Sequence, residues 1–115
     1  MHATLQTQYS TMGETLKVRV IGAVDVDTSP AFREELQQAW NPSLKLMDLD
    51  FSEVQYISSP GIALLLEIRQ LLAKDNAAVV VSAASQQVRD VLTTCRLDTM
   101  FLPDGHSGPP VSAAS

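Results

Sequence analysis

The stretch Ser58-Ser59-Pro60-Gly61 lies in the middle of the chain, directly before a long apolar run. A serine hydroxyl can accept a phosphoryl group, and serine is also a favoured residue at the start of a helix. The apolar run predicts a helix over residues 60–74, with Ser59 as its N-cap and Pro60 as its first residue. Local pattern alone favours a plain cap. A phosphate on Ser59 would add about −1.5 to −2 charges beside the unpaired amides of the first helical turn.

A second serine-proline pair, Ser29-Pro30, follows a loop that carries the carboxylates of Asp25 and Asp27. The pair predicts the N-cap and first residue of another helix, which ends at Asn41-Pro42. An aspartate just before such a start commonly closes a turn or caps the helix. We favour that structural role for Asp27.

The segments that lead into these two helix starts have the patterns of strands. Residues 15–21 alternate between apolar and polar side chains, which is typical of a strand with one buried face. Residues 4–9 predict a weaker strand, joined to it by a turn that contains Gly13. Uninterrupted apolar segments at 44–51 and 77–81 indicate buried strands of a parallel sheet.

Three helices and a last short strand complete the expected order of elements. The third helix is expected over residues 85–94, with Cys95 at its end as a buried small side chain, and the last strand over 100–102. Strands that alternate with helices predict the α/β class. We therefore expect one domain with a mixed, mostly parallel β-sheet, helices packed on it and an opening β-hairpin.

Composition excludes several classes of protein. The chain has 115 residues, which fits one domain over residues 1–102, and residues 103–115 are rich in Gly, Pro, Ser and Ala and predict a flexible tail. The net charge of −5, without a basic cluster, argues against nucleic acid and anionic membranes as partners. Without a visible signal peptide or a membrane-spanning run, and with a single cysteine, a cytoplasmic location is expected.

The residues that could do chemistry do not form a catalytic set. His2 and His106 stand near the two ends of the chain, without spaced Cys, His or carboxylate partners. We therefore expect no metal site. Between residues 3 and 102 there is no histidine that could activate a serine or a cysteine. We expect a protein that is not an enzyme and that needs no cofactor.

The helix over residues 60–74 has more apolar side chains than one buried face requires. The surplus around Ile62 and Leu64 has two readings, which the sequence leaves open. It forms an exposed docking patch beside Ser59, or neighbouring helices cover it.

Three segments, Gly22-Ala23-Val24-Asp25, residues 49–54 and residues 56–62, resemble the successive signatures of STAS domains. The resemblance covers about residues 5–102, and the most similar subfamily is that of the bacterial anti-sigma-factor antagonists. Their loop before the second helix typically reads Asp-Ser-Ser/Thr-Gly, with the phosphorylated serine two residues before the glycine. That position is Ser59 here, while Ser58 and Pro60 depart from the pattern.

The resemblance implies a function in a partner-switching pathway. The unphosphorylated protein would bind an anti-sigma factor that is also a serine kinase, of the histidine-kinase-like ATPase type. Phosphorylation at Ser59, with Ser58 as the second choice, would release it, and a serine phosphatase would reset the switch. The expected partner-binding residues lie in the two loops and the helix start: Val24, Asp25, Asp27, Ser58, Ser59, Gly61 and Ile62. For Asp25 a partner contact and a structural role are both open.

A second function is compatible with the same resemblance. STAS domains also occur as subunits of lipid-transport ABC systems, where they dock on an ATPase as structural binding modules and need no phosphorylation. Pro60 leaves this alternative open.

Overall fold

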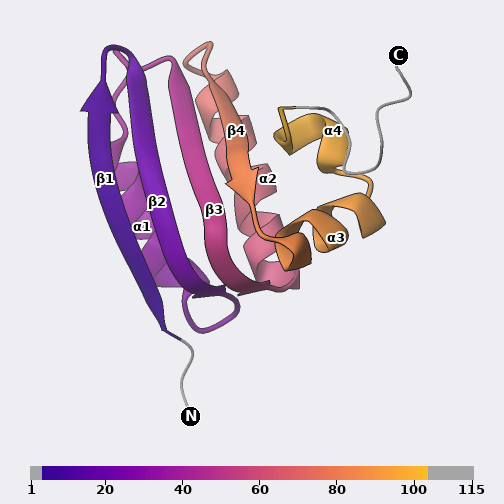
Figure 1. Cartoon of the computed structure of the whole chain (residues 1–115). Helices are drawn as coiled ribbons and strands as arrows, with labels where there is room; N and C mark the ends of the chain where they lie inside the picture. Colours follow the sequence, from indigo (N-terminus) through magenta and orange to yellow (C-terminus); the bar gives the residue numbers. More distant parts are fainter. Residues whose placement is uncertain (1–3, 104–115) are drawn as a thin grey trace.

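A computed structural model describes residues 4–103 of the chain; of the expected tail at 103–115, only Pro103 lies within this range. These residues form a four-stranded sheet with helices α1 and α2 on one face (Figure 1). The elements in chain order are β1 (Leu5–Met12), β2 (Thr15–Val24), α1 (Ser29–Ala39), β3 (Leu46–Ile57), α2 (Ser59–Ala73), β4 (Ala78–Ala84), α3 (Gln86–Thr94) and α4 (Asp98–Phe101).

The sheet has the order β1-β2-β3-β4, in which β1 is antiparallel to β2 and the other two pairs are parallel. A two-residue turn joins β1 to β2, and its Gly13 has a φ of +60°, a region that glycine enters without steric cost. Each parallel pair needs a crossover, which α1 and α2 supply. The predicted fold class, including the opening hairpin, is therefore confirmed.

The hydrophobic core lies between the sheet and helices α1 and α2. Val18 and Val20 of β2 and Leu49 of β3 are at most 1% exposed and meet side chains such as Leu65 from the helices. Burial of one such side chain contributes about 1.5–3 kcal/mol to stability. The alternating pattern of β2 arises because only one face of the sheet is covered.

The predicted last strand at residues 100–102 is wrong. Residues 98–101 form the short helix α4, and Phe101 and Leu102 are buried in the core. Helices α3 and α4 lie beside the outer strand β4 (Figure 1). An apolar triplet has no periodicity that separates a strand from a helical turn, so the sequence could not decide between them.

Strand β3 is longer than the apolar segment that predicted it. It continues past Phe51 to Ile57, six residues beyond the end of the predicted segment. Register shifts occur against β2 near Ile21 and Ala23 and against β4 near Asp50. Such irregularities break the alternation of side chains, so the second half of the strand has no period-two pattern.

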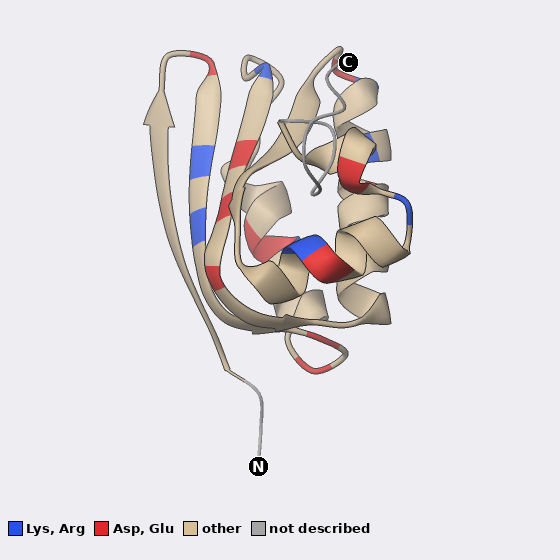
Figure 2. Cartoon of the chain, turned by 45° about the vertical axis from the view of Figure 1, so that its right-hand side comes forward, with Lys and Arg blue, Asp and Glu red and all other residues tan. Residues whose placement is uncertain are grey.

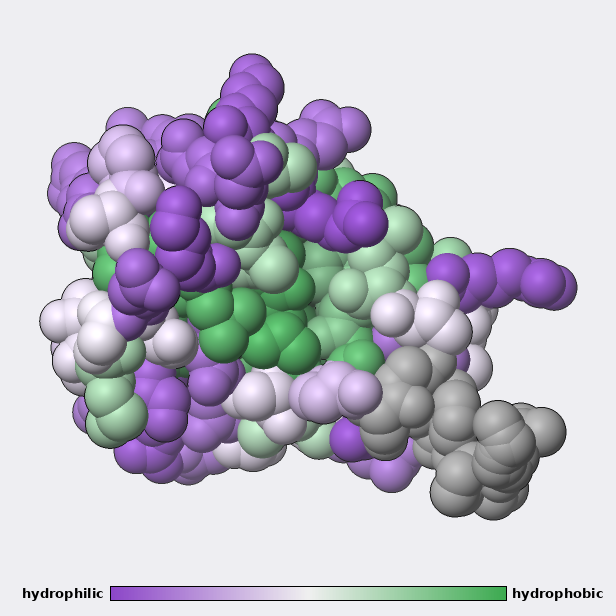
Figure 3. Space-filling model, turned by 90° about the horizontal axis from the view of Figure 1, so that it is seen from above, coloured by the Kyte–Doolittle hydropathy of each residue, from purple (hydrophilic) through white to green (hydrophobic). Residues whose placement is uncertain are grey.

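The end of the molecule that carries the β1–β2 turn is closed by apolar side chains. Figure 3 looks onto this end and shows a hydrophobic area in the middle of the view, surrounded by hydrophilic side chains. The C-terminal ends of α1 and α2 border a shallow hollow of about 240 Å³ here, crossed by a hydrogen bond from Trp40 Nε1 to Asp75 Oδ2 of 3.1 Å. Within residues 4–103, no helix has the length and hydrophobicity that a membrane span requires.

Candidate functional site

The opposite end of the molecule brings together the two loops that the sequence singled out. Strands β2 and β3 are parallel, so their carboxyl ends meet at one edge of the sheet, where Val24 pairs with Ile57. The backbone amide of Ser58 donates to the carbonyl of Val24 at 3.1 Å. The start of α2 therefore lies against the loop at residues 25–28. Edges of this kind are the usual location of binding sites in α/β proteins.

Ser58 and Ser59 differ in accessibility. The N-cap is Ser58 rather than Ser59, and Ser59 is the first residue of α2 with an exposed side chain. Ser58 is half-buried, and its Oγ is buried without a hydrogen-bond partner among the described residues. Of the two serines, Ser59 is therefore the one whose side chain is open to solvent.

Gly61 is needed for the close contact between α2 and the end of β2. A Cβ atom at this position would lie 2.7 Å from the carbonyl oxygen of Val24 and 2.8 Å from Cγ1 of Ile57. Both distances are shorter than real Cβ contacts, and one of them involves the backbone. Because Gly61 and Val24 are both buried, they position the site from beneath its surface.

The loop at residues 25–28 is held by Asp25. Its Oδ1 accepts hydrogen bonds from the amides of Asp27 at 2.9 Å and Thr28 at 3.1 Å. The turn-closing role expected for Asp27 therefore belongs to Asp25. The side chains of Asp27 and of Val26, which is 66% exposed, face solvent beside the start of α2.

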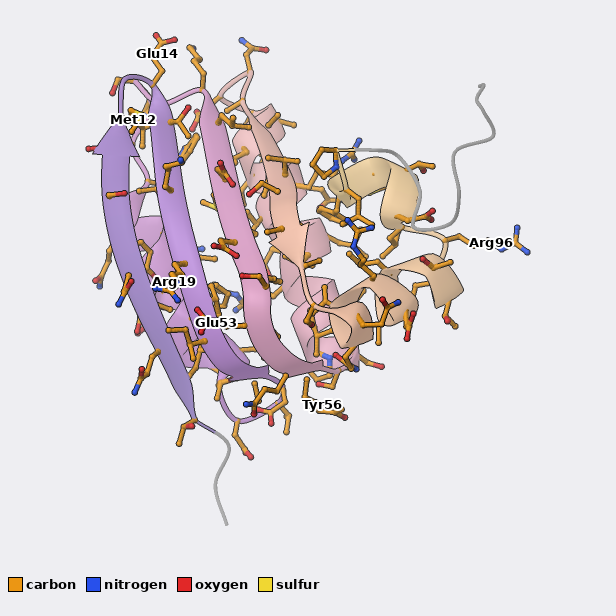
Figure 4. All side chains as sticks on the ribbon, in the orientation of Figure 1. Met12, Glu14, Arg19, Glu53, Tyr56 and Arg96 are labelled. Carbon is orange, nitrogen blue, oxygen red and sulfur yellow. The ribbon has the colours of Figure 1, made fainter. Side chains whose placement is uncertain are left out.

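A groove runs from the start of α2 to helix α3. It has a volume of about 420 Å³ and is lined by Tyr56, Ile57, Ser58, Ser59, Ile62, Gln87, Val91 and Cys95. Figure 4 shows Tyr56 at the far end of β3, where its side chain is 49% exposed. The groove places an apolar surface next to the accessible hydroxyl of Ser59.

The structure decides between the two readings of the apolar surplus in α2. Ile62 is 8% exposed and Leu64 is 2% exposed, so neighbouring elements cover both. Ile62 nevertheless lines the groove. Cys95 also lines it and is exposed, contrary to our expectation of a buried side chain. Sequence reasoning missed the residues from α3 because they are about thirty positions away from Ser59.

Side chains at the start of α3 hold the last part of β3. Strand β4 pairs with β3 only as far as Phe51. Beyond that point Ser85 Oγ donates to the carbonyl of Val54 at 2.6 Å, and Gln87 Oε1 accepts from the amide of Ile57 at 3.0 Å. These bonds satisfy backbone groups that a longer β4 would otherwise pair. They fix the segment that leads into Ser58 and Ser59.

The electrostatics of the site are set by helix α2. Its first turn contains no acidic residue, so the partial positive charge of the helix N-terminus is not offset there. Within residues 4–103, no three His, Cys, Asp or Glu side chains are grouped as metal ligands. The arrangement places Ser59, whose side chain is exposed, beside an apolar groove.

Comparison with solved structures shows the same fold in anti-sigma factor antagonists. The unphosphorylated form of the antagonist SpoIIAA has a TM-score of 0.72 and 19% identity, with 84% of this chain and 85% of that chain covered. An antagonist from Mycobacterium paratuberculosis has a TM-score of 0.76 and 24% identity, with 86% and 85% covered. The phosphorylated form of SpoIIAA, a Bacillus cell fate determinant, has a TM-score of 0.67 and 18% identity, with 84% and 88% covered.

Sequence comparison identifies the family. No curated protein sequence matches the chain. The sequence model of the family described as "Mlab, STAS domain" matches residues 7–103, which is most of the chain. The chain therefore belongs to the STAS domain family.

Proposed function

We propose that this chain is an anti-sigma-factor antagonist that binds an anti-sigma serine kinase and is released when Ser59 is phosphorylated. The observation that carries the proposal is that Ser59 is exposed and lines the apolar groove, at a helix start bonded to the end of β2. The fold is similar to SpoIIAA in both its unphosphorylated and its phosphorylated form. Phosphorylation is therefore compatible with a fold of this kind.

The physical basis of the switch is desolvation. A partner that fills the groove removes water from its apolar walls, which include Tyr56 and Ile62. A phosphate on Ser59 would place about two negative charges at the edge of that contact. Burying an unpaired charge costs several kcal/mol, so the complex would dissociate while the fold stays intact.

The proposed partner surface divides into contact residues and supporting residues. The exposed residues Val26, Asp27, Tyr56 and Ser59 are available for contact, while Ile62 is buried but lines the groove. The supporting residues lie beneath them: Val24, Asp25, Ser58 and Gly61. The proposed partners are an anti-sigma factor of the histidine-kinase-like ATPase type and a serine phosphatase. The chain itself acts as a cytoplasmic binding module without catalysis or cofactor.

The test compares Ser59→Ala and Ser59→Asp with the wild type. Candidate ATPases captured from source cells are purified, and their affinity for each form is measured by calorimetry. We expect Ser59→Ala to bind like the wild type and Ser59→Asp to bind at least 100-fold more weakly, about 2.7 kcal/mol. With ATP, mass spectrometry should find one phosphate, on Ser59. Ser29→Ala is the matched control, because Ser29 also stands between a hydroxyl residue and a proline.

A second candidate is the structural subunit of a lipid-transport ABC system. It is favoured by Pro60, which stands where the antagonists carry Ser or Thr, and by the family description, which is not specific to antagonists. If the captured ATPase belongs to a transporter and all three forms bind it equally, this function replaces the first.

A further inference from the structure

One face of the sheet is covered by α1 and α2, and the other face is open. Strands β2, β3 and β4 are parallel, and parallel sheets in proteins are usually covered on both faces. The open face carries a hollow of about 440 Å³. Its lining is mainly polar and comes from all four strands: Gln8, Tyr9, Ser10, Lys17, Val18, Arg19, Asp48, Asp50 and Ser82. Any macromolecule that covers this face has to match polar and charged groups.

The charges on the open face form two stripes of opposite sign. Figure 2 shows the basic residues on β2 beside the acidic residues on β3. In the register of the sheet, Lys17 lies next to Asp48, and Arg19 lies next to Asp50. Each strand therefore presents a row of one sign, at the same heights along the strands.

The stripes are only partly neutralised within the chain. Arg19 forms an ion pair with Glu53, and Figure 4 shows these two side chains pointing toward one another from β2 and β3. Asp48 accepts a hydrogen bond from Ser82, which leaves most acceptor sites of its carboxylate open. Within residues 4–103, Lys17 forms no ion pair.

Asp50 remains charged at neutral pH. Burial alone would raise the pKa of its carboxyl, but hydrogen bonds from the hydroxyl and amide of Ser52, together with the charge of Arg19, lower it. The acidic stripe therefore carries at least this negative charge at neutral pH.

The arrangement is self-complementary. Consider a twofold axis that is parallel to the strands and lies above the open face, midway between β2 and β3. Rotation about this axis places β2 of one copy over β3 of the other. Each residue keeps its position along the strand direction. The rotation places Lys17 of one copy over Asp48 of the other, and Arg19 over Asp50. The same operation repeats both contacts, as in any isologous interface. Two sheets related in this way have the nearly aligned strand directions that face-to-face packing requires.

We propose that the open face is the interface of a homodimer in which the basic stripe of each copy meets the acidic stripe of the other. Nucleic acid does not fit, because the acidic stripe would repel its phosphates. The contacts are charged and hydrated, so the dimer is weak and dissociates at high salt. The axis follows the strands, so both Ser59 ends point the same way and stay uncovered. This proposal is independent of phosphorylation.

The test is charge reversal with complementation. Lys17→Glu/Arg19→Glu makes the face wholly acidic, and Asp48→Lys/Asp50→Lys makes it basic. Sedimentation velocity at low salt, with protein up to about 1 mM, measures association. We expect a concentration-dependent dimer for the wild type, loss of self-association for each double variant, and a heterodimer tighter than the wild type in their 1:1 mixture. Arg33→Glu, on the ion pair between α1 and α2, is the control and should leave dimerisation unchanged.

Two results would overturn the proposal. One is a wild type that stays monomeric at low salt together with double variants that stay monomeric when mixed, with circular dichroism showing that they are folded. The second result comes from an NMR measurement on the wild type, which needs no variant and therefore applies even if a variant does not fold. Amide NMR shifts that change on dilution should map to β2 and β3 around Lys17 and Asp48; changes confined to the Ser59 end would contradict the interface.

Discussion

Helices α1 and α2 begin with nearly the same three residues, Thr28-Ser29-Pro30 and Ser58-Ser59-Pro60. Each follows a strand of the same parallel pair. In each, the carbonyl of the first residue accepts the amide four positions later, at 3.1 Å for Phe32 and 3.0 Å for Ile62. In local sequence and in this first helical hydrogen bond, the two starts are alike.

Their surroundings differ. Ser29 is 8% exposed, whereas Ser59 is exposed. The hydroxyl of Thr28 is used by two backbone groups, while Ser58 Oγ has no partner among the described residues. A serine-proline helix start therefore does not by itself indicate a modifiable serine. The packing of the preceding loop decides whether the serine side chain is buried or exposed.

The largest difference should follow from placing a negative charge at both serines. Ser29→Asp puts a carboxylate in a buried position without a partner, which should lower the free energy of unfolding by about 3 kcal/mol or more. Ser59→Asp puts it at an exposed helix N-terminus and should stabilise by about 0.3–1 kcal/mol or leave stability unchanged. Urea unfolding measures both. Equal effects would mean that the two starts are not packed differently.

Substitutions two residues after each serine, at Gly61 and Ala31, should give a smaller difference in stability. Gly61→Ala forces a methyl group against the carbonyl of Val24, and we expect a loss of about 1–3 kcal/mol. Ala31→Gly, at the equivalent exposed position of α1, should cost about 1 kcal/mol or less through backbone entropy. The comparison uses the midpoints of urea unfolding. A Gly61→Ala protein as stable as the wild type would show that α2 does not depend on this close contact.

The two N-cap hydroxyls should also respond differently. Thr28→Val removes an acceptor for the amide of Asp25 and a donor to the carbonyl of Ala23. It should cost about 1–3 kcal/mol, because partly buried polar groups lose their partners. Ser58→Ala removes a hydroxyl without a hydrogen-bond partner among the described residues. The expected change in the free energy of unfolding is therefore below about 0.5 kcal/mol. Thermal unfolding of the two variants side by side measures the difference, and a Ser58→Ala protein that is the less stable one would contradict it.

The smallest effect concerns only the start of α2. Gln87→Ala removes the acceptor for the amide of Ile57, and we expect this amide to exchange its hydrogen about 5–10-fold faster. Amides near Thr28 should exchange at unchanged rates. Gln86→Ala, which loses a bond to the exposed Asp90, is the matched control. Unchanged exchange at Ile57 would show that α3 does not hold the segment before Ser58.

The sequence predicted the fold because its main signals are local. The alternation in β2 and the apolar run in α2 are each readable within one element, and both occur where expected. The prediction for the last segment failed because three residues, 100–102, are too few to show a helical or strand periodicity. The second half of β3 was not predicted because its register shifts depend on the pairing with β2 and β4. The sequence of one strand does not contain that information.

The candidate site was only partly predictable for the same reason. The loop and helix-start residues stand out as a motif with Ser59 at its centre. The exposure of Cys95 and the groove beside it depend on where α3 lies. The turn-closing role of Asp25 instead of Asp27 depends on the direction of one carboxylate, and both residues stand in similar local sequence.

Pro60 has a consequence for how long a modification at Ser59 would last. Proline has no amide hydrogen, and the amide of Ile62 is already bonded to the carbonyl of Ser58. Of the first turn, that leaves the amides of Ser59 and Gly61 to face a phosphate. A phosphoryl group held by so few donors stays hydrated and accessible to a phosphatase. The lifetime of the phosphorylated state would then be set by the rates of the kinase and the phosphatase. The fold around Ser59 would contribute little to it.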